Sequence, residues 1–162
     1  MGNRLDAAVS LREVTKENLR EVLRLKVAPD QDRFVAPNAV SIAQAYFDRD
    51  VAWFRAIYAD ETPVGFVMLH DEPGARKYYL WRFMIDHRYQ KLGYGAKALE
   101  QVIDYVRHRP GALELLTSIV PGEGSPGGFY ETLGFRYTGD LDEGEQVMRL
   151  PLSDSRTKES AT

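Results

Sequence analysis

The stretch "FMIDHRYQKLGYGAKALEQVIDYV", residues 83–106, decides how the rest of the chain is interpreted. An aromatic, strand-like segment runs through two closely spaced glycines into a repeating apolar pattern. Leu99, Ile103 and Val106 fall on one face at helical spacing, which predicts an amphipathic helix over about residues 93–107.

The two glycines at the start of this helix, Gly93 and Gly95, allow two interpretations. They form a simple entry turn, or they leave backbone N–H groups at a helix N-terminus accessible to a phosphate. The stretch contains neither the G-x-G-x-x-G pattern of a dinucleotide-binding turn nor the G-K-[ST] ending of a Walker loop. The glycines alone therefore leave both interpretations open.

The remaining pattern predicts an α/β domain built from short strands and a few helices. The segment 52–86 is expected to form three consecutive antiparallel strands, because aromatic and β-branched runs alternate with turn residues. Asn38 is expected to cap the helix that follows it. The predicted strands are 11–14, 52–59, 64–70, 77–86, 113–120 and a pair around 140–145, the predicted helices are 15–26, 40–47, 93–107 and 129–135, and 27–38 is predicted as a loop.

The length of 162 residues and the 44% hydrophobic content predict one globular domain. Residues 10–152 are predicted as the domain, 1–9 as a flexible extension and 153–162 as a disordered tail without apolar content. The chain has no cysteine, which excludes thiolate nucleophiles, disulfides and cysteine metal sites and fits a reducing cytoplasm. We expect no metal, no membrane span and no signal peptide.

The formal net charge of −3, without a basic cluster, argues against nucleic acid as a partner and mildly suits a cationic small molecule. The sequence leaves open whether the chain is a monomer or a homodimer.

Two motifs resemble the GNAT superfamily of acyl-CoA N-acyltransferases. "FMIDHRYQKLGYGAKAL" (83–99) resembles its central motif, a strand followed by [RQ]-x-x-G-x-[GA] at a helix start. "FYETLGF" (129–135) resembles its later signature, in which a tyrosine precedes a Gly-Phe pair by one turn. The order of predicted elements also follows the family from about residue 11 to 150. The resemblance implies a single-domain GNAT fold with a mixed, mostly antiparallel sheet of six to seven strands and about four helices.

The resemblance implies acetyl-CoA as cosubstrate and places its contacts. Backbone amides of the glycine loop would hold the pyrophosphate, and the preceding strand would pair its main chain with the pantetheine arm. "GEGSPGG" (122–128) replaces the family's usual helical segment, so the helix with Tyr130 is expected to start late, near Gly127, and Ser125 is only a candidate contact. The implied coenzyme-binding residues are Phe83, Met84, Ile85, Gln90, Lys91, Leu92, Gly93, Tyr94, Gly95, Ala96 and Ser125.

Tyr130 matches the family's proton donor to the departing coenzyme thiolate. A phenol with a reference pKa of about 10 is protonated at neutral pH and can donate to a thiolate. An amide near Met84 or Ile85 would face the acetyl carbonyl, where a backbone N–H stabilises the oxyanion that forms during acyl transfer.

The general base does not carry over from the family. The strand "YYLWRFMID" contains Arg82 and no carboxylate before Asp86. Deprotonating an alkylammonium with a pKa of about 10.4 at pH 7 costs roughly 4.6 kcal/mol, so a proton acceptor is needed. Glu123 is the leading candidate, followed by His70 and Asp71, and a chain of water molecules is the alternative.

The substrate is predicted to be a primary amine, and a polyamine such as spermidine or spermine is favoured. "WRFMID" and "GEGSPGGFYETLGF" resemble most the diamine and spermidine N-acetyltransferase branch of the family. The alternatives are an acetyltransferase that acts on a protein amine or an amino-sugar, and a catalytically silent coenzyme-binding sensor domain. Acidic and aromatic residues expected near the mouth of the site would suit a cation: Asp30, Asp32, Phe34, Tyr46, Phe47 and Glu123.

Overall fold

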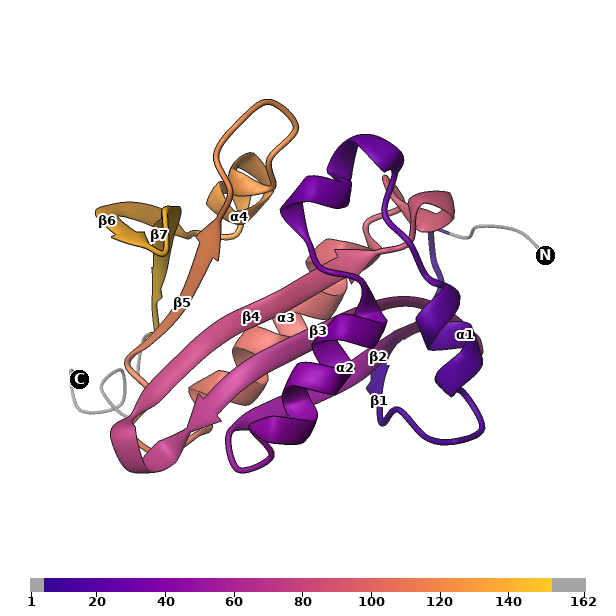
Figure 1. Ribbon diagram of the computed structural model, residues 1–162, viewed down its shortest axis with the longest axis horizontal. Coiled ribbons are helices and arrows are strands. Elements are labelled where there is room, and N and C mark those ends of the chain that lie inside the picture. The colour runs from indigo at the N-terminus through magenta and orange to yellow at the C-terminus, as the bar shows by residue number, and fades with distance from the viewer. Residues whose placement is uncertain (1–4, 153–162) are drawn as a thin grey trace, which may run out of the picture.

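The computed structural model describes residues 5–152, which form a seven-stranded mixed sheet covered by helices on both faces (Figure 1). The strand order is β1-β2-β3-β4-β5-β7-β6, and every neighbouring pair is antiparallel except β4 and β5. The predicted α/β fold class is confirmed. The elements are β1 (Val9–Arg12), α1 (Leu19–Arg24), η1 (Pro29–Phe34), α2 (Asn38–Phe47), β2 (Ala52–Ala59), β3 (Thr62–Glu72), η2 (Pro73–Ala75), β4 (Lys77–Ile85), η3 (His87–Tyr89), α3 (Tyr94–Arg107), β5 (Glu114–Ile119), α4 (Gly127–Thr132), β6 (Arg136–Asp142) and β7 (Glu145–Pro151).

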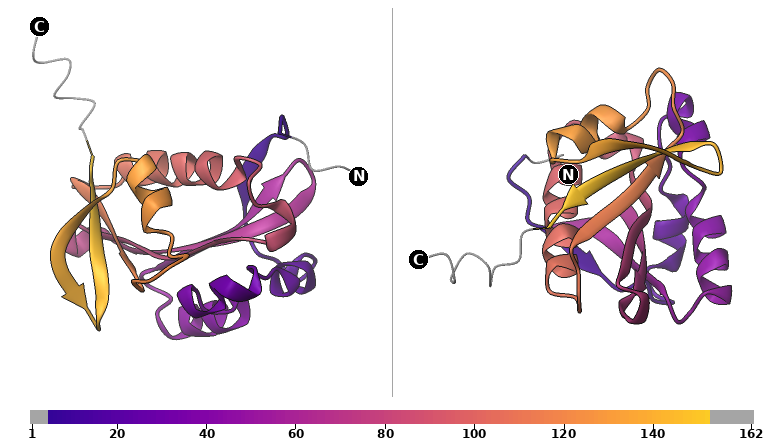
Figure 2. Two further views of the ribbon diagram at one scale, coloured as in Figure 1. Left: turned by 90° about the horizontal axis from the view of Figure 1, so that it is seen from above. Right: turned by 90° about the vertical axis from the view of Figure 1, so that its left-hand side faces the viewer.

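Two hydrophobic layers hold the helices to the sheet. Figure 2 shows α3 and α4 on one face and α1 and α2 on the other. The predicted apolar stripe of α3 is buried, since Leu99 and Val106 are inaccessible and Ile103 is nearly so. The opposite layer includes Val22 of α1 and Phe66 of β3. Each fully buried side chain of this size contributes about 1.5–3 kcal/mol, so both layers stabilise the sheet that carries the site.

β4 and β5 stay paired over a very short distance and then separate. Their register consists of Tyr79 opposite Leu116 and Leu80 opposite Thr117. Beyond these pairs β4 continues to Ile85, and Figure 1 shows β5 turning away from it. The β5-facing edge of the last part of β4 is therefore left without a neighbouring strand within the described residues, and we call this opening the β4–β5 gap.

A β-bulge in β4 changes which way its side chains point. Met68 of β3 pairs with Arg82, whereas the next residue of β3 pairs with Leu80, so Trp81 is the extra residue. Trp81 and Arg82 therefore both face α1 and α2, and Phe83 faces α3.

Three local predictions need correction. The predicted loop 27–38 contains the 3-10 helix η1, which begins at Pro29, because proline is favourable in a first helical turn. Asn38 does not cap α2, since its buried side chain donates a 2.9 Å hydrogen bond to the Val22 carbonyl and so joins α2 to α1. β1 begins at Val9, earlier than the predicted strand, and Ala7 packs into the core.

Both predicted terminal segments fall wholly or partly outside the described part of the chain. Residues 153–162 and residues 1–4 are not described, so the predicted disordered tail and flexible extension stay predictions. Within residues 5–152, no helix has the length and apolar character needed to cross a membrane.

Candidate active site

The chain between β4 and α3 turns sharply and presents a bare helix start. Lys91 and Gly93 adopt left-handed conformations with φ of 65° and 82°, and Gly93 is the N-cap of α3. Because glycine has no side chain, it cannot cap the first-turn amides, such as those of Gly95 and Ala96, by a side-chain hydrogen bond. The positive end of a 14-residue helix is thereby open to an anion.

Gly95 brings this helix start close to β4 and α4. A Cβ atom at Gly95 would lie 3.4 Å from Phe129 Cζ, 3.5 Å from Ile85 Cγ1 and 3.7 Å from Phe83 Cζ. The rings of Phe83 and Phe129 stack with centroids 6.0 Å apart and an interplanar angle of 10°. Gly95 therefore lets the start of α3 pack closely against β4 and α4, where any other residue would add a side chain.

Gln90 holds the loop in place. Its side-chain nitrogen Nε2 donates to the Ile85 carbonyl at 2.9 Å and to Gln31 Oε1 at 2.8 Å. These bonds join the loop to the end of β4 and to η1. Gln90 therefore helps to fix the shape of the loop.

Asp86 is a structural anchor of the loop that the sequence analysis missed. Its buried carboxylate accepts hydrogen bonds from Arg88 N at 3.0 Å, Arg88 Nε at 2.8 Å and Lys26 N at 2.9 Å. Burial alone would raise the pKa of Asp86, but the hydrogen bonds from Arg88 and Lys26 outweigh it and hold the pKa below its usual value. An aspartate directly after an apolar strand, with an arginine two residues later, was the available signal.

We expect Asp86→Asn to lower the free energy of unfolding by about 2–3 kcal/mol at pH 7, because buried donors lose a charged acceptor. The folded pKa lies below the unfolded value, so the stabilisation is present above about pH 3.9 and is lost as the pH falls further. Urea titrations at pH 7 and pH 3 measure this, with Asp50→Asn as an exposed control. A variant as stable as the wild type at pH 7 would contradict the anchoring role.

Tyr130 lies in α4, which starts at Gly127 as predicted. The side chain is 5% exposed, and burial raises its pKa while a hydrogen bond with the Thr117 side chain partly opposes this. Thr117 in turn donates to the Leu80 carbonyl at 3.0 Å. Leu80 and Thr117 form the last pair between β4 and β5. A neutral phenol is thus held where the two strands separate. Ser125 stands at the start of α4 and accepts a 3.4 Å hydrogen bond from Gly127 N.

The β5–α4 loop and η1 meet near the outer end of the β4–β5 gap (Figure 1). Arg33 donates to the backbone carbonyl of Glu123 at 2.8 Å, and a Cβ at Gly124 would lie 3.6 Å from the Phe34 ring. Glu123 is exposed, as are Asp30 and Asp32 on η1. The structure therefore brings η1 and the β5–α4 loop together, and their place at the mouth of the site stays a prediction.

His70 and Asp71, the next candidates for the base, are placed elsewhere. His70 pairs with Tyr79, about 13 Å along β4 from Phe83, and its Nε2 lies 3.5 Å from a Glu72 carboxylate oxygen. Asp71 is buried on the α3 face. It accepts a 2.6 Å hydrogen bond from Tyr105 and forms a 3.1 Å ion pair with Arg109.

Burial, and secondly the hydrogen bond to Asp71, raises the pKa of Tyr105 to about 12. His70 lies far along the sheet from Phe83, and the Asp71 carboxylate is already bound by Tyr105 and Arg109. Both were therefore wrong as candidates for the base.

Tyr46 and Phe47 were also expected at the mouth and are not there. They lie at the C-terminal end of α2, where they line a cavity of about 540 Å³ with His70 and Glu72. A ten-residue helix is about 15 Å long, so α2 carries its last residues away from Phe34.

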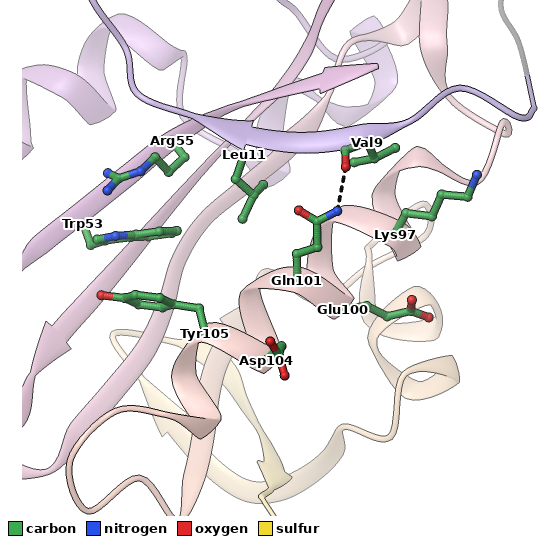
Figure 3. Close-up of a pocket in the computed structure, with 9 residues that line it drawn as sticks. All are labelled: Val9, Leu11, Trp53, Arg55, Lys97, Glu100, Gln101, Asp104 and Tyr105. Carbon is green, nitrogen blue, oxygen red and sulfur yellow. Dashed lines mark hydrogen bonds between the residues drawn. The ribbon is translucent and has the colours of Figure 1, made fainter. Parts of the chain in front are cut away.

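A larger cavity of about 630 Å³ lies between β1, β2 and α3 (Figure 3). Trp53 stacks on Tyr105 with ring centroids 4.5 Å apart, and Arg55 lies 4.6 Å above the Trp53 ring. The Gln101 side chain donates to the Val9 carbonyl at 2.7 Å. β3 separates this cavity from β4, and its lining includes no residue predicted for the active site.

Comparisons with known proteins agree with this geometry. The model of the Acetyltransferase (GNAT) family matches residues 12–135. The spermine/spermidine N(1)-acetyltransferase of Bacillus subtilis (strain 168) is 27% identical over 150 residues, covering 87% of this chain and 97% of that protein.

Solved structures share the fold. An acetyltransferase of Thermus thermophilus matches with a TM-score of 0.71 at 21% identity and covers 90% of this chain and 97% of its own. The PaiA N-acetyltransferase of Thermoplasma acidophilum, in complex with coenzyme A, matches with a TM-score of 0.66 at 22% identity, covering 89% and 99%. The predicted resemblance is confirmed: the chain belongs to the GNAT family of acetyltransferases.

Proposed function

We propose that this enzyme moves the acetyl group of acetyl-CoA to a primary amine of a polyamine, such as spermidine or spermine, within a ternary complex in the cytoplasm. The observation that carries the reaction is the position of Tyr130, which is held by Thr117 at the opening of the β4–β5 gap. The polyamine is supported by the likeness to the Bacillus subtilis enzyme. A chimera of Vibrio cholerae spermidine N-acetyltransferase SpeG and hSSAT also matches, with a TM-score of 0.65 at 17% identity over 93% of this chain and 98% of its own.

The proposed coenzyme contacts follow the glycine loop and the open edge of β4. Amides from Gln90 to Ala96, including those of Leu92 and Tyr94, bind the pyrophosphate, and the exposed Lys91 side chain reaches a phosphate. The main chain of Phe83–Ile85 binds the pantetheine arm, and Ser125 adds a contact from the start of α4. Acetyl-CoA supplies the thioester from which the acetyl group is transferred.

Two proton transfers accompany this reaction. Tyr130, whose phenol is neutral at physiological pH, gives its proton to the sulfur that leaves. An amide near Met84 or Ile85 stabilises the oxyanion of the acetyl group. Glu123 is the base that the sequence predicts for the proton of the amine.

Thiol release with a panel of amines tests the proposal. We expect kcat/KM for spermidine and spermine to exceed that for butylamine by about tenfold or more, since each further ammonium that meets a carboxylate contributes about 1.4 kcal/mol. Preferential turnover of a peptide amine or an aminoglycoside would favour the alternative acceptors. Binding of acetyl-CoA without turnover of any amine would favour a silent coenzyme-binding domain.

A further inference from the structure

The face of the β4–β5 gap that is turned toward α1 and α2 carries a carboxylate that the sequence did not single out. Thr117 points toward Tyr130, so the next residue of β5, Ser118, points to the opposite face of the sheet. Ser118 donates a 2.7 Å hydrogen bond to Oε2 of Glu145, the first residue of β7. The Glu145 carboxylate is therefore within one hydrogen bond of the strand residue at which β5 leaves β4.

The groups around Glu145 come from β4 and from the end of β6. Arg82 faces the same side of the sheet, where it donates to Gln44 Oε1 of α2 at 3.1 Å, and its buried Nε has no hydrogen-bond partner among residues 5–152. The charge of Glu145 raises the pKa of Arg82, against the larger lowering by burial, so the two charges interact. Tyr79 donates to Asp142 Oδ2 at 3.3 Å on the same side.

The two faces of the gap therefore offer different chemistry. The glycine loop, Phe83 and Tyr130 lie on the α3 face, to which the proposed function assigns the coenzyme and its departing sulfur. The opposite face presents a half-buried carboxylate with a fixed orientation. An amine that approaches the acetyl carbon from this side meets Glu145 first.

We propose that Glu145, rather than Glu123, binds the ammonium group of the acceptor and takes its proton, and that Ser118 is its positioning residue. The proposal rests on the amine acetylation proposed above. Glu123 is exposed, and the hydrogen bond that fixes it involves its backbone carbonyl, whereas the Glu145 side chain itself is held.

The protons and bonds balance as follows. The ammonium nitrogen gives one proton to the Glu145 carboxylate, which later releases it to solvent. The nitrogen then forms the amide bond with the acetyl carbon, the carbon–sulfur bond breaks, and the sulfur takes the proton of Tyr130. The second proton of the nitrogen restores Tyr130, and the third stays on the amide.

The pH dependence of kcat/KM for the amine tests this assignment. With Glu145 as proton acceptor, the reactive pair is a carboxylate and an ammonium ion, so log kcat/KM is expected to be flat between about pH 6 and 9, well below the amine pKa of about 10.4. In Glu145→Gln only the free amine reacts, so log kcat/KM should rise with a slope near 1. The ratio of kcat/KM in the wild type to kcat/KM in Glu145→Gln should therefore grow about tenfold for each pH unit below the amine pKa.

Four further variants make the test specific. Glu143→Gln changes an exposed glutamate of the same hairpin turn and should match the wild type. Glu123→Gln should keep the flat profile. Glu145→Asp keeps a carboxylate and should lose rate without gaining slope. Ser118→Ala should lose rate, and Ser118→Thr, which keeps the hydroxyl, should restore it.

Calorimetric binding of acetyl-CoA shows that each variant is folded. The assignment would be overturned if log kcat/KM had the same slope against pH in the wild type and Glu145→Gln. It would also be overturned if the slope near 1 appeared in Glu123→Gln instead.

The wild-type panel separates this proposal from the polyamine proposal. If no polyamine is acetylated, the polyamine proposal fails, and the slopes are measured on the primary amine that is turned over. If the wild type acetylates no amine, both proposals fail.

Discussion

Tyr130→Phe is expected to lower kcat on a polyamine by about 100-fold or more, which is the loss typical of a removed general acid. The substitution keeps the ring that packs against Phe129 and Phe135 and removes only the hydroxyl. Because the proton is needed when the sulfur leaves, the loss should appear in kcat and should not depend on which amine is used.

Steady-state thiol release and acetyl-CoA calorimetry measure the two parts of this prediction. Acetyl-CoA affinity should survive, since the role proposed for Tyr130 concerns the leaving sulfur. The lost hydrogen bond with Thr117 should lower stability by only about 1 kcal/mol. Tyr46→Phe, at the exposed end of α2, is the matched control. A fully active Tyr130→Phe enzyme would show that another group protonates the thiolate.

Gly95→Val is expected to weaken acetyl-CoA binding by roughly 100-fold, equivalent to about 2.7 kcal/mol. The position of a Cβ is already in van der Waals contact with Phe129, Ile85 and Phe83, so the two methyl groups of valine would displace the rings or the helix start. They would also cover the amides proposed to bind the diphosphate and so remove charge-assisted hydrogen bonds.

Gly95→Ala is the graded control for this prediction. Its single methyl group fits at 3.4–3.7 Å from the neighbouring carbons, so affinity should fall much less than in the valine variant. Gly128→Ala adds a methyl group on α4 that would meet no other element of the described chain within 4 Å, and it should change nothing. A folded Gly95→Val variant with wild-type affinity would mean that the glycines form only an entry turn.

The parts of the site that the sequence predicted are those encoded over a few consecutive residues. The glycines at 93 and 95 and the apolar stripe of α3 predict a helix start, and the Gly-Pro-rich segment before Tyr130 predicts a late start of α4. Both elements appear as expected. These features depend on local backbone preferences, which sequence patterns express directly.

The carboxylates were harder to assign because their partners are far away in sequence. Asp71 meets Tyr105, 34 residues later, and Ser118 meets Glu145, 27 residues later. The packing of α3 on the sheet decides the first contact and the β5–β7 register decides the second, and a one-residue change of register moves a side chain to the other face. Composition near a predicted mouth likewise does not tell in which direction α2 runs, so Tyr46 and Phe47 were misplaced.

The bulge at Trp81 decides to which face of the sheet each later side chain of β4 points. Side chains of a regular strand alternate between faces, so a single inserted residue inverts every position after it. Without Trp81 as an extra residue, Phe83 would point toward α1 and α2 and Arg82 toward α3. Substitutions within β4 thus change one face of the strand at a time, whereas a one-residue insertion or deletion in this strand would exchange the side chains that its two faces present. Evolutionary change in this part of the chain should therefore proceed by substitution and not by change of length.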